Sequence, residues 1–157
     1  MPELILALDQ SSSTGWAVVS ASDGNILTSG TAKFSGEHGK KLSSFYAWLA
    51  NMIEEYHPIA LAHEKPHFRG YAATMLGAGL VAIINMTGYQ HNLPVLSVHT
   101  ATLKKFATGK GKAVKADMTQ VASDVIGSSL SARENNDEAD AIHIARWAVE
   151  EYNKNAE

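Results

Sequence analysis

Residues 4–8 form a short unbroken apolar run, Leu-Ile-Leu-Ala-Leu, that ends directly in an aspartate, Asp9. A strand that is apolar at every position has to be covered on both faces, so the run predicts a central strand between layers of helices. The residues after Asp9 are a Ser/Thr/Gly cluster, which predicts a turn. The fold is therefore expected to be layered, with the Asp9 carboxylate at the C-terminal end of a buried strand.

The next segments predict strands that pair beside the first one and a helix that covers them. Strands at 16–19 and 26–34 flank residues 23–25, Asp-Gly-Asn, a sequence typical of a tight turn between antiparallel strands. Between residues 40 and 56 the apolar residues recur at three- and four-residue steps, which indicates a helix with one apolar face. Pro58 ends that helix because proline cannot continue it.

The rest of the chain alternates strands and helices. We expect a buried strand at 59–62 running into Glu64, a small-residue helix at 72–88, a strand at 94–98, and helices from about 100, at 117–126 and at 137–152. Residues 108–112 predict a mobile loop, and Asn135 and Asn136 are expected to cap the last helix. This order predicts an α/β fold in a single domain, residues 1–157. Its five-stranded mixed sheet has three antiparallel strands, then two strands parallel to the first, and is flanked by helices.

Composition limits the chemistry that the chain can perform. The 157 residues include no cysteine, which excludes disulfides, thiolate zinc sites and cysteine nucleophiles. A metal must therefore be held by oxygen or imidazole ligands. The chain has no run of eighteen apolar residues, and acids stand at positions 3 and 9. This argues against a membrane partner or a signal peptide and predicts a soluble intracellular protein.

Charge is segregated along the chain. The formal net charge of −3 argues mildly against a nucleic-acid partner. Between residues 99 and 116, however, there are five lysines and no acid, whereas residues 124–157 are rich in acids. The lysines are Lys104, Lys105, Lys110, Lys112 and Lys115. They are candidates for contacts to phosphates, and the alternative is a solvated loop.

Four carboxylates stand out because the expected topology could bring them together. Asp9 and Glu64 end strands, and Asp137 and Asp140 share one helix face because they are three residues apart. Such a group repels itself unless cations neutralise it, and oxygen-only ligands suit Mg²⁺ or Mn²⁺. Two ions about 3.5–4 Å apart support phosphodiester hydrolysis by activating water and stabilising the leaving oxygen. The cluster therefore predicts a metal-dependent nuclease.

Each acid also has an ordinary structural explanation. Asp9 could bond the backbone of the turn that follows it, and Asp137 could be an acid at a helix N-terminus. Glu64 and Asp140 fit this explanation less well, because their sequence neighbours are apolar and a buried acid needs a partner. We assign no histidine to a metal, since a histidine on a helix or beside a turn is more often packed or solvated.

Taken in order, these motifs resemble those of RuvC-type Holliday-junction resolvases, nucleases of the ribonuclease H-like superfamily, over nearly the whole chain. Residues 6–16 (LALDQSSSTGW) are similar to the family's first strand, acidic residue and Thr-Gly-aromatic turn, and residues 62–64 (AHE) to its second acidic strand end. Residues 76–95 are similar to a helix and strand shared by its members, residues 104–115 to its basic segment, and residues 137–141 (DEADA) to its C-terminal acidic pair. The Lys- and Gly-rich loop looks closest to that of phage-encoded members.

The resemblance implies a ribonuclease H-like fold and a crossover junction endodeoxyribonuclease with two Mg²⁺ ions, for which Mn²⁺ substitutes. It makes four carboxylates the metal ligands and catalytic residues, and adds one catalytic lysine that stabilises the transition state: Asp9, Glu64, Asp137, Asp140 and Lys115.

The resemblance also assigns residues to DNA binding. They are Lys104, Lys105, Lys110, Lys112, Lys115, His67, Phe68 and Arg69. The family has an aromatic wedge in the loop after its second acid, and either His67 or Phe68 could stack on an unpaired base there. Packing in the core is the alternative for Phe68.

The implied reaction is symmetric nicking of two strands of a four-way junction by a homodimer, which leaves 5′-phosphates. Junction and dimer share two-fold symmetry. Other branched DNA is a further candidate substrate, and the implied compartment is the cytoplasm of a bacterial cell or a phage-infected host. Helix 72–88 is the implied dimer surface, although Gly77 and Gly79 could instead mark close packing within one subunit.

Three other functions are compatible with parts of the sequence. A YqgF-like nuclease would act on RNA or another branched nucleic acid, and the basic segment favours DNA junctions over it. A nucleotide-binding domain of the actin-like or sugar-kinase type would need a second lobe, for which 157 residues leave no room. A non-catalytic junction-binding module would not need all four carboxylates.

Overall fold

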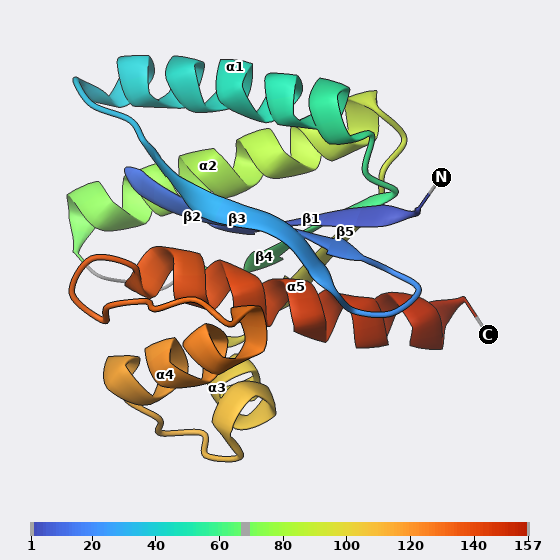
Figure 1. The fold of residues 1–157 in the computed structure, drawn as a ribbon. Coiled ribbons are helices and arrows are strands. Elements are labelled where there is room, and N and C mark those ends of the chain that lie inside the picture. Colours follow the sequence, from blue (N-terminus) through green and yellow to red (C-terminus); the bar gives the residue numbers. More distant parts are fainter. Residues whose placement is uncertain (1, 67–69, 157) are drawn as a thin grey trace.

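A five-stranded sheet lies between helices on both of its faces in the computed structural model, which describes residues 2–66 and 70–156 (Figure 1). The strands are β1 (Leu4–Asp9), β2 (Ser13–Ser20), β3 (Ile26–Lys33), β4 (Ala60–Glu64) and β5 (Val95–Val98). The helices are α1 (His38–Tyr56), α2 (Tyr71–Gln90), α3 (Thr100–Thr108), α4 (Lys115–Ile126) and α5 (Asn136–Asn155).

The sheet is mixed and has the order β3-β2-β1-β4-β5. Strand β2 pairs antiparallel with both β1 and β3, whereas β4 runs parallel to β1 and β5 runs parallel to β4. The expected α/β fold and strand directions are therefore confirmed. Strand β1 occupies the centre, which explains why its sequence is apolar at every position before the terminal aspartate.

Alternation along the strands decides which layer each side chain faces. In β1, Ile5 and Ala7 belong to the core beneath α5, whereas Leu6 belongs to the core beneath α1 and α2. Strand β4 alternates in the same way, with Ala62 on the α5 side and Leu61 on the opposite side. The acid that ends each strand continues the first series, so both acids lie on the α5 face of the sheet.

Helix α5 packs very closely on this face. A Cβ atom added to Gly15 of β2 would lie 1.8 Å from the backbone oxygen of Asp137, which is far shorter than any real contact. The residues of α5 that face the sheet further along include Ala141, Ala145 and Ala148, all fully buried. Glycine in the strand and alanines in the helix therefore let the first turn of α5 rest directly on the sheet.

Two details at helix N-termini differ from the expectation. Asn135 occupies the N-cap position of α5 without a capping side-chain bond, because its Oδ1 accepts the Ser131 N–H at 3.0 Å instead. The next asparagine is already the first residue of the helix. Helix α4 begins at Lys115, two residues earlier than expected, because the Asp117 carboxylate accepts the Val114 N–H at 3.4 Å and stabilises an earlier first turn.

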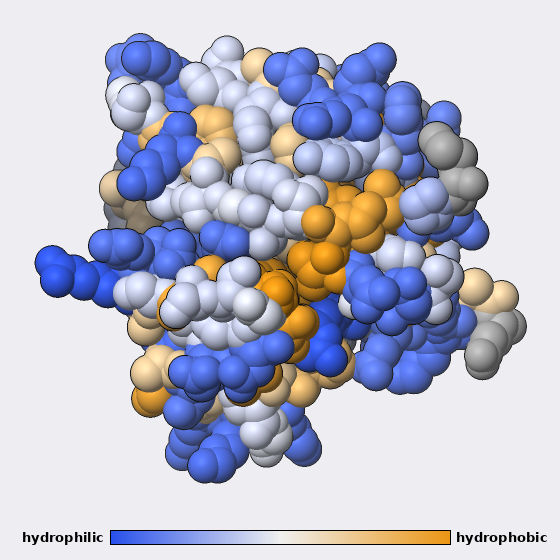
Figure 2. All heavy atoms as spheres, in the orientation of Figure 1, coloured by the Kyte–Doolittle hydropathy of each residue, from blue (hydrophilic) through white to orange (hydrophobic). Residues whose placement is uncertain are grey.

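Helix α2 leaves much of its apolar surface uncovered. Its 18-residue window has a mean hydropathy of 1.4, long and apolar enough to cross a membrane by length and composition alone, and 22% of that window is buried. The face of the molecule seen in Figure 2 is mostly hydrophilic, and the band of hydrophobic residues across its middle lies at the level of the sheet, below α2. The sequence shows no unbroken run of eighteen apolar residues because glycine, threonine and asparagine interrupt the apolar residues of α2.

Candidate active site

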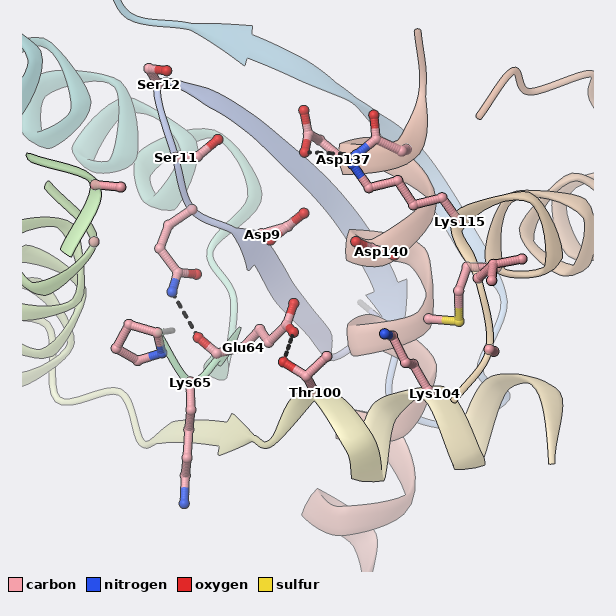
Figure 3. Close-up of a pocket in the computed structure, with 18 of the residues that line it drawn as sticks. Asp9, Ser11, Ser12, Glu64, Lys65, Thr100, Lys104, Lys115, Asp137 and Asp140 are labelled. Carbon is pink, nitrogen blue, oxygen red and sulfur yellow. Dashed lines mark hydrogen bonds between the residues drawn. The ribbon is translucent and has the colours of Figure 1, made fainter. Parts of the chain in front are cut away.

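A polar cavity of about 720 Å³ opens where the ends of β1 and β4 meet the first turns of α3, α4 and α5. Residues of α2 also line it, so segments from the first strand to the last helix build one pocket, and Figure 3 shows side chains converging on it. Parallel pairing of β1 with β4 brings the two strand ends together, since Leu8 lies opposite His63 in the register. The acids Asp9 and Glu64 follow these two residues directly.

Three of the four expected metal ligands form a tight cluster. Asp9, Glu64 and Asp140 each offer a carboxylate oxygen, and these oxygens all lie within 4.8 Å of one another. Alternation along β1 and β4 turns the first two carboxylates toward α5, and the close packing of α5 brings Asp140 to meet them. All three side chains are at least partly shielded from solvent.

Asp137, the fourth expected ligand, lines the same cavity one turn before Asp140 but lies outside the three-residue cluster. Asn136 donates from Nδ2 to its Oδ1 at 3.4 Å. Burial raises the pKa of Asp137, against a hydrogen bond from Ser13 and the positive charge of Lys115. Its position allows it to complete the ligand set from the side of the helix.

Among the acids that line the pocket, Asp140 has a strongly shifted pKa. Burial, together with the negative charges of Glu64 and Asp137, raises its pKa to about 7, although the ammonium groups of Lys115 and Lys104 act in the opposite direction. In the absence of a cation, burial and the neighbouring carboxylates together let Asp140 hold a proton near neutral pH. A divalent cation would relieve the repulsion between the carboxylates.

Glu64 is held by two residues that the sequence did not single out. The Thr100 hydroxyl donates to Glu64 Oε1, and Gln10 Nε2 donates to the Glu64 backbone oxygen at 2.7 Å (Figure 3). The pairing of β4 with β5 could have pointed to Thr100. The two strands are parallel and Glu64 lies opposite Val98, so the residues after β5 must lie beside Glu64. Using that pairing requires the register, which the sequence alone did not supply.

The basic segment supplies one wall of the cavity. Lys104 at the middle of α3, Lys112 in the following turn and Lys115 at the start of α4 all line it. Lys105 and Lys110 are exposed on the same segment but do not line the cavity. The other residues expected to contact DNA, at 67–69, lie outside the described residues.

The two buried histidines bond to backbone oxygens. His63 Nδ1 lies 2.9 Å from the Glu64 oxygen, on the sheet face opposite α5, and His143 Nε2 lies 2.7 Å from the Met118 oxygen between α4 and α5. Burial lowers the pKa of both imidazoles. These contacts give the two histidines structural roles.

The donor set fits a hard divalent cation. Three carboxylates converge without cysteine or histidine among them, and oxygen ligands of this kind suit Mg²⁺ or Mn²⁺. Burial raises the pKa of both Asp137 and Asp140, and at Asp140 the negative charges of Glu64 and Asp137 raise it further. The lysines opposite complete a site that can receive a phosphate group.

Comparisons with known proteins agree with this geometry. The profile of the family "Crossover junction endodeoxyribonuclease RuvC" matches residues 5–147. The RuvC of Roseiflexus sp. (strain RS-1) is 29% identical over 136 residues, which cover 83% of this chain and 80% of that protein. The RuvC of Pseudothermotoga lettingae is 33% identical over 82 residues, about half of each chain (52% and 51%).

The fold is shared with solved structures of low sequence similarity. The structure described as Thermus thermophilus RuvC in complex with a Holliday junction substrate superimposes with a TM-score of 0.79 at 18% identity, covering 95% of this chain and 96% of that one. The ribonuclease H-like architecture expected from the resemblance is therefore confirmed.

The raised pKa of Asp140 predicts a pH-dependent gain in stability for Asp140→Asn in the metal-free protein. The folded state holds a proton up to about pH 7, whereas an unfolded Asp loses it near pH 4, so wild-type stability falls as pH rises between these values. At pH 8 the variant should be more stable by on the order of 2 kcal/mol, and the difference should vanish near pH 4. Urea unfolding in EDTA at several pH values measures it.

Asp124→Asn is the matched control, because Asp124 is an exposed carboxylate on α4 outside the cavity. Its effect should be small at every pH. The buried histidines change stability below about pH 6.5 equally in wild type and variant, so they cancel in the difference. Equal stability of Asp140→Asn and wild type at pH 8 would contradict a raised pKa of Asp140.

Proposed function

The chain belongs to the RuvC family of crossover junction endodeoxyribonucleases, and from this premise we propose that it resolves Holliday junctions by symmetric, metal-dependent nicking of two strands. The observation that carries the proposal is the convergence of Asp9, Glu64 and Asp140 opposite a lysine-lined wall. The products would carry 5′-phosphates. The relative from Thermus thermophilus, solved with a Holliday junction substrate, supports the same substrate for this chain.

The proposed cofactor is Mg²⁺, two ions per site, with Mn²⁺ as a substitute. Asp9, Glu64 and Asp140 would hold it, with Asp137 as a further ligand. When bound, the ions supply Lewis-acid chemistry that activates water and stabilises the leaving oxygen. The carboxylates orient that chemistry toward the cavity, and their arrangement on β1, β4 and α5 is fixed by the core beneath them.

The lysines perform the second part of the proposed reaction. The positive charge of Lys115 offsets part of the rise in the pKa values of Asp137 and Asp140, and Figure 3 shows its side chain reaching toward Asp137 at the side of the cavity. There it would stabilise charge that develops on the scissile phosphate. Lys104 and Lys112 would bind the phosphates on either side, and the exposed Lys105 and Lys110 would extend this contact along the DNA.

The proposed active form is a homodimer in which α2 forms the interface. Tyr71, Met75, Met86 and Tyr89 are all exposed, and together with Ala82 they are spaced four, seven, four and three residues apart, which places them along one face of α2. Large exposed apolar side chains in such a row favour a protein surface as their partner. A second copy of the chain is the partner that matches the two-fold symmetry of a four-way junction.

The glycines of α2 contribute to packing within the subunit. A Cβ atom at Gly79 would lie 2.9 Å from Leu42 Cδ2 of α1, and one at Gly77 would lie 3.6 Å from Pro66 Cβ. Gly79 therefore allows α1 and α2 to approach closely. The large side chains of the row stay exposed beside this contact.

Other branched DNA is a further proposed substrate, and the proposed compartment is the cytoplasm of a bacterial cell or a phage-infected host. The relatives described above are bacterial, so a phage origin stays a prediction. A YqgF-like activity on RNA and a non-catalytic junction-binding module are the alternatives. The clustered carboxylates favour cleavage over binding alone.

Cleavage of a synthetic four-way junction tests the proposed function. With Mg²⁺ the wild type should make paired nicks near the crossover, make none in EDTA, and leave a matched linear duplex uncut. Asp140→Asn should lower the rate by about 100-fold or more while junction binding persists. Denaturing gel electrophoresis of end-labelled strands measures the nicks, and native gel shifts measure binding.

Asp124→Asn serves again as the control and should cut at the wild-type rate, because its side chain lies outside the cavity. Tight junction binding without a cut in Mg²⁺ or Mn²⁺ would indicate the non-catalytic module. Equal binding of junction and duplex would overturn the resolvase proposal and direct attention to RNA.

A charge placed on the exposed row of α2 should separate the proposed dimer. Ala82→Glu puts a carboxylate in the middle of the row, where burial against a second copy would be costly, whereas Ala47→Glu puts one on the exposed face of α1. Light scattering after size exclusion should show a dimer for wild type and Ala47→Glu and a monomer for Ala82→Glu. A monomeric wild type, or dimers in all three proteins, would contradict the proposed interface.

A further inference from the structure

Thr100 connects a carboxylate of the metal cluster with the helix that carries a basic residue of the cavity. It is the first residue of α3, and its hydroxyl donates to Glu64 Oε1. Lys104 lies four residues later, so it shares a helix face with Thr100, and both residues line the cavity. Figure 3 shows the two side chains of α3 and the Glu64 carboxylate on the same side of the pocket.

The backbone around this contact is firmly placed. Glu64 pairs with Val98 in the parallel register of β4 and β5, and the Lys65 N–H donates to the Val98 oxygen at 2.8 Å. Gln10 Nε2 holds the Glu64 backbone oxygen from the other side at 2.7 Å. The hydroxyl of Thr100 therefore reaches Glu64 from a rigid part of the fold, with its donor position fixed by the strands.

The side chain of Glu64 needs such a restraint. It has three rotatable bonds, and its carboxylate lies in a cluster whose ligand oxygens are within 4.8 Å of one another. Like charges at this separation repel, so an unrestrained glutamate would rotate away from Asp9 and Asp140. A hydrogen bond to one oxygen fixes the direction of the other, which is how neighbouring groups commonly orient metal-binding carboxylates.

We propose that Thr100 is a positioning residue: its hydroxyl holds Glu64 in the orientation in which the carboxylate joins Asp9 and Asp140 around a divalent cation. Through the same contact, α3 and Lys104 keep a fixed place relative to the cation. This inference rests on the proposed function for the identity of the cation. It assigns to Thr100 a role in metal affinity, which a residue that only begins a helix would not have.

The experiment compares three threonine variants of the 157-residue chain. Thr100→Val keeps the shape of the side chain and removes the hydroxyl, Thr100→Ser keeps the hydroxyl, and Thr102→Val changes an exposed threonine on the same helix. Titration calorimetry with Mn²⁺ alone, without DNA, measures metal affinity. The Mg²⁺ concentration for half-maximal junction cleavage gives a second value, and thermal unfolding in EDTA reports on the fold.

Thr100→Val should weaken Mn²⁺ binding by about 10-fold or more and raise the half-maximal Mg²⁺ concentration similarly, with thermal unfolding close to wild type. Thr100→Ser should recover most of the affinity, and Thr102→Val should match wild type. If Thr100→Val unfolds early, the comparison of Thr100→Ser with Thr100→Ala replaces it: Ser binding Mn²⁺ tightly and Ala weakly supports the role.

Wild-type Mn²⁺ affinity in the variants that lack the hydroxyl would overturn the positioning role while leaving junction cleavage intact. A wild type that binds Mn²⁺ but cuts no junction would instead overturn the proposed function. The role of Thr100 would then be decided by the Mn²⁺ affinities of its variants alone. A wild type that binds neither Mn²⁺ nor Mg²⁺ would overturn both.

Discussion

The close packing of α5 on the sheet is the contact on which the active site depends. Only a glycine at position 15 leaves room for the Asp137 backbone, since a Cβ atom there would lie 1.8 Å from its oxygen. Buried alanines continue the close approach along the helix. Asp140 is thereby carried to the ends of β1 and β4, where Asp9 and Glu64 already face α5 because of the alternation along their strands.

The close packing of α5 brings negatively charged side chains together, and their repulsion destabilises the metal-free fold. Burial and neighbouring negative charges raise the pKa of Asp140 to about 7, so the metal-free protein gathers its carboxylates at a cost in stability. Lysines on α3 and α4 offset part of that cost, and a divalent cation would offset more. The same charges that strain the metal-free fold therefore suit the cluster to hold hard cations, which is the property that a metal-dependent nuclease needs.

The sequence was enough to predict the fold and the meeting of Asp9, Glu64 and Asp140, because both follow from local patterns, whereas Asp137, expected to join them, lies outside the cluster. Apolar strands ending in Asp9 and Glu64 and an acid among alanines at Asp140 are visible without coordinates. The contacts that the sequence did not predict depend on the strand register, or on which of several hydrogen-bond partners a side chain takes. Thr100 meets Glu64 only through the pairing of β4 with β5, and Asn135 fails to cap α5 because it bonds Ser131 instead.

The central claim is that the three clustered carboxylates form a metal centre, and anomalous diffraction from crystals soaked in Mn²⁺ tests it most directly. The account predicts anomalous density in the cavity about 2.2 Å from oxygens of Asp9, Glu64 and Asp140. Side chains in the positions described here, with Mn²⁺ bound elsewhere and no density between these carboxylates, would contradict it.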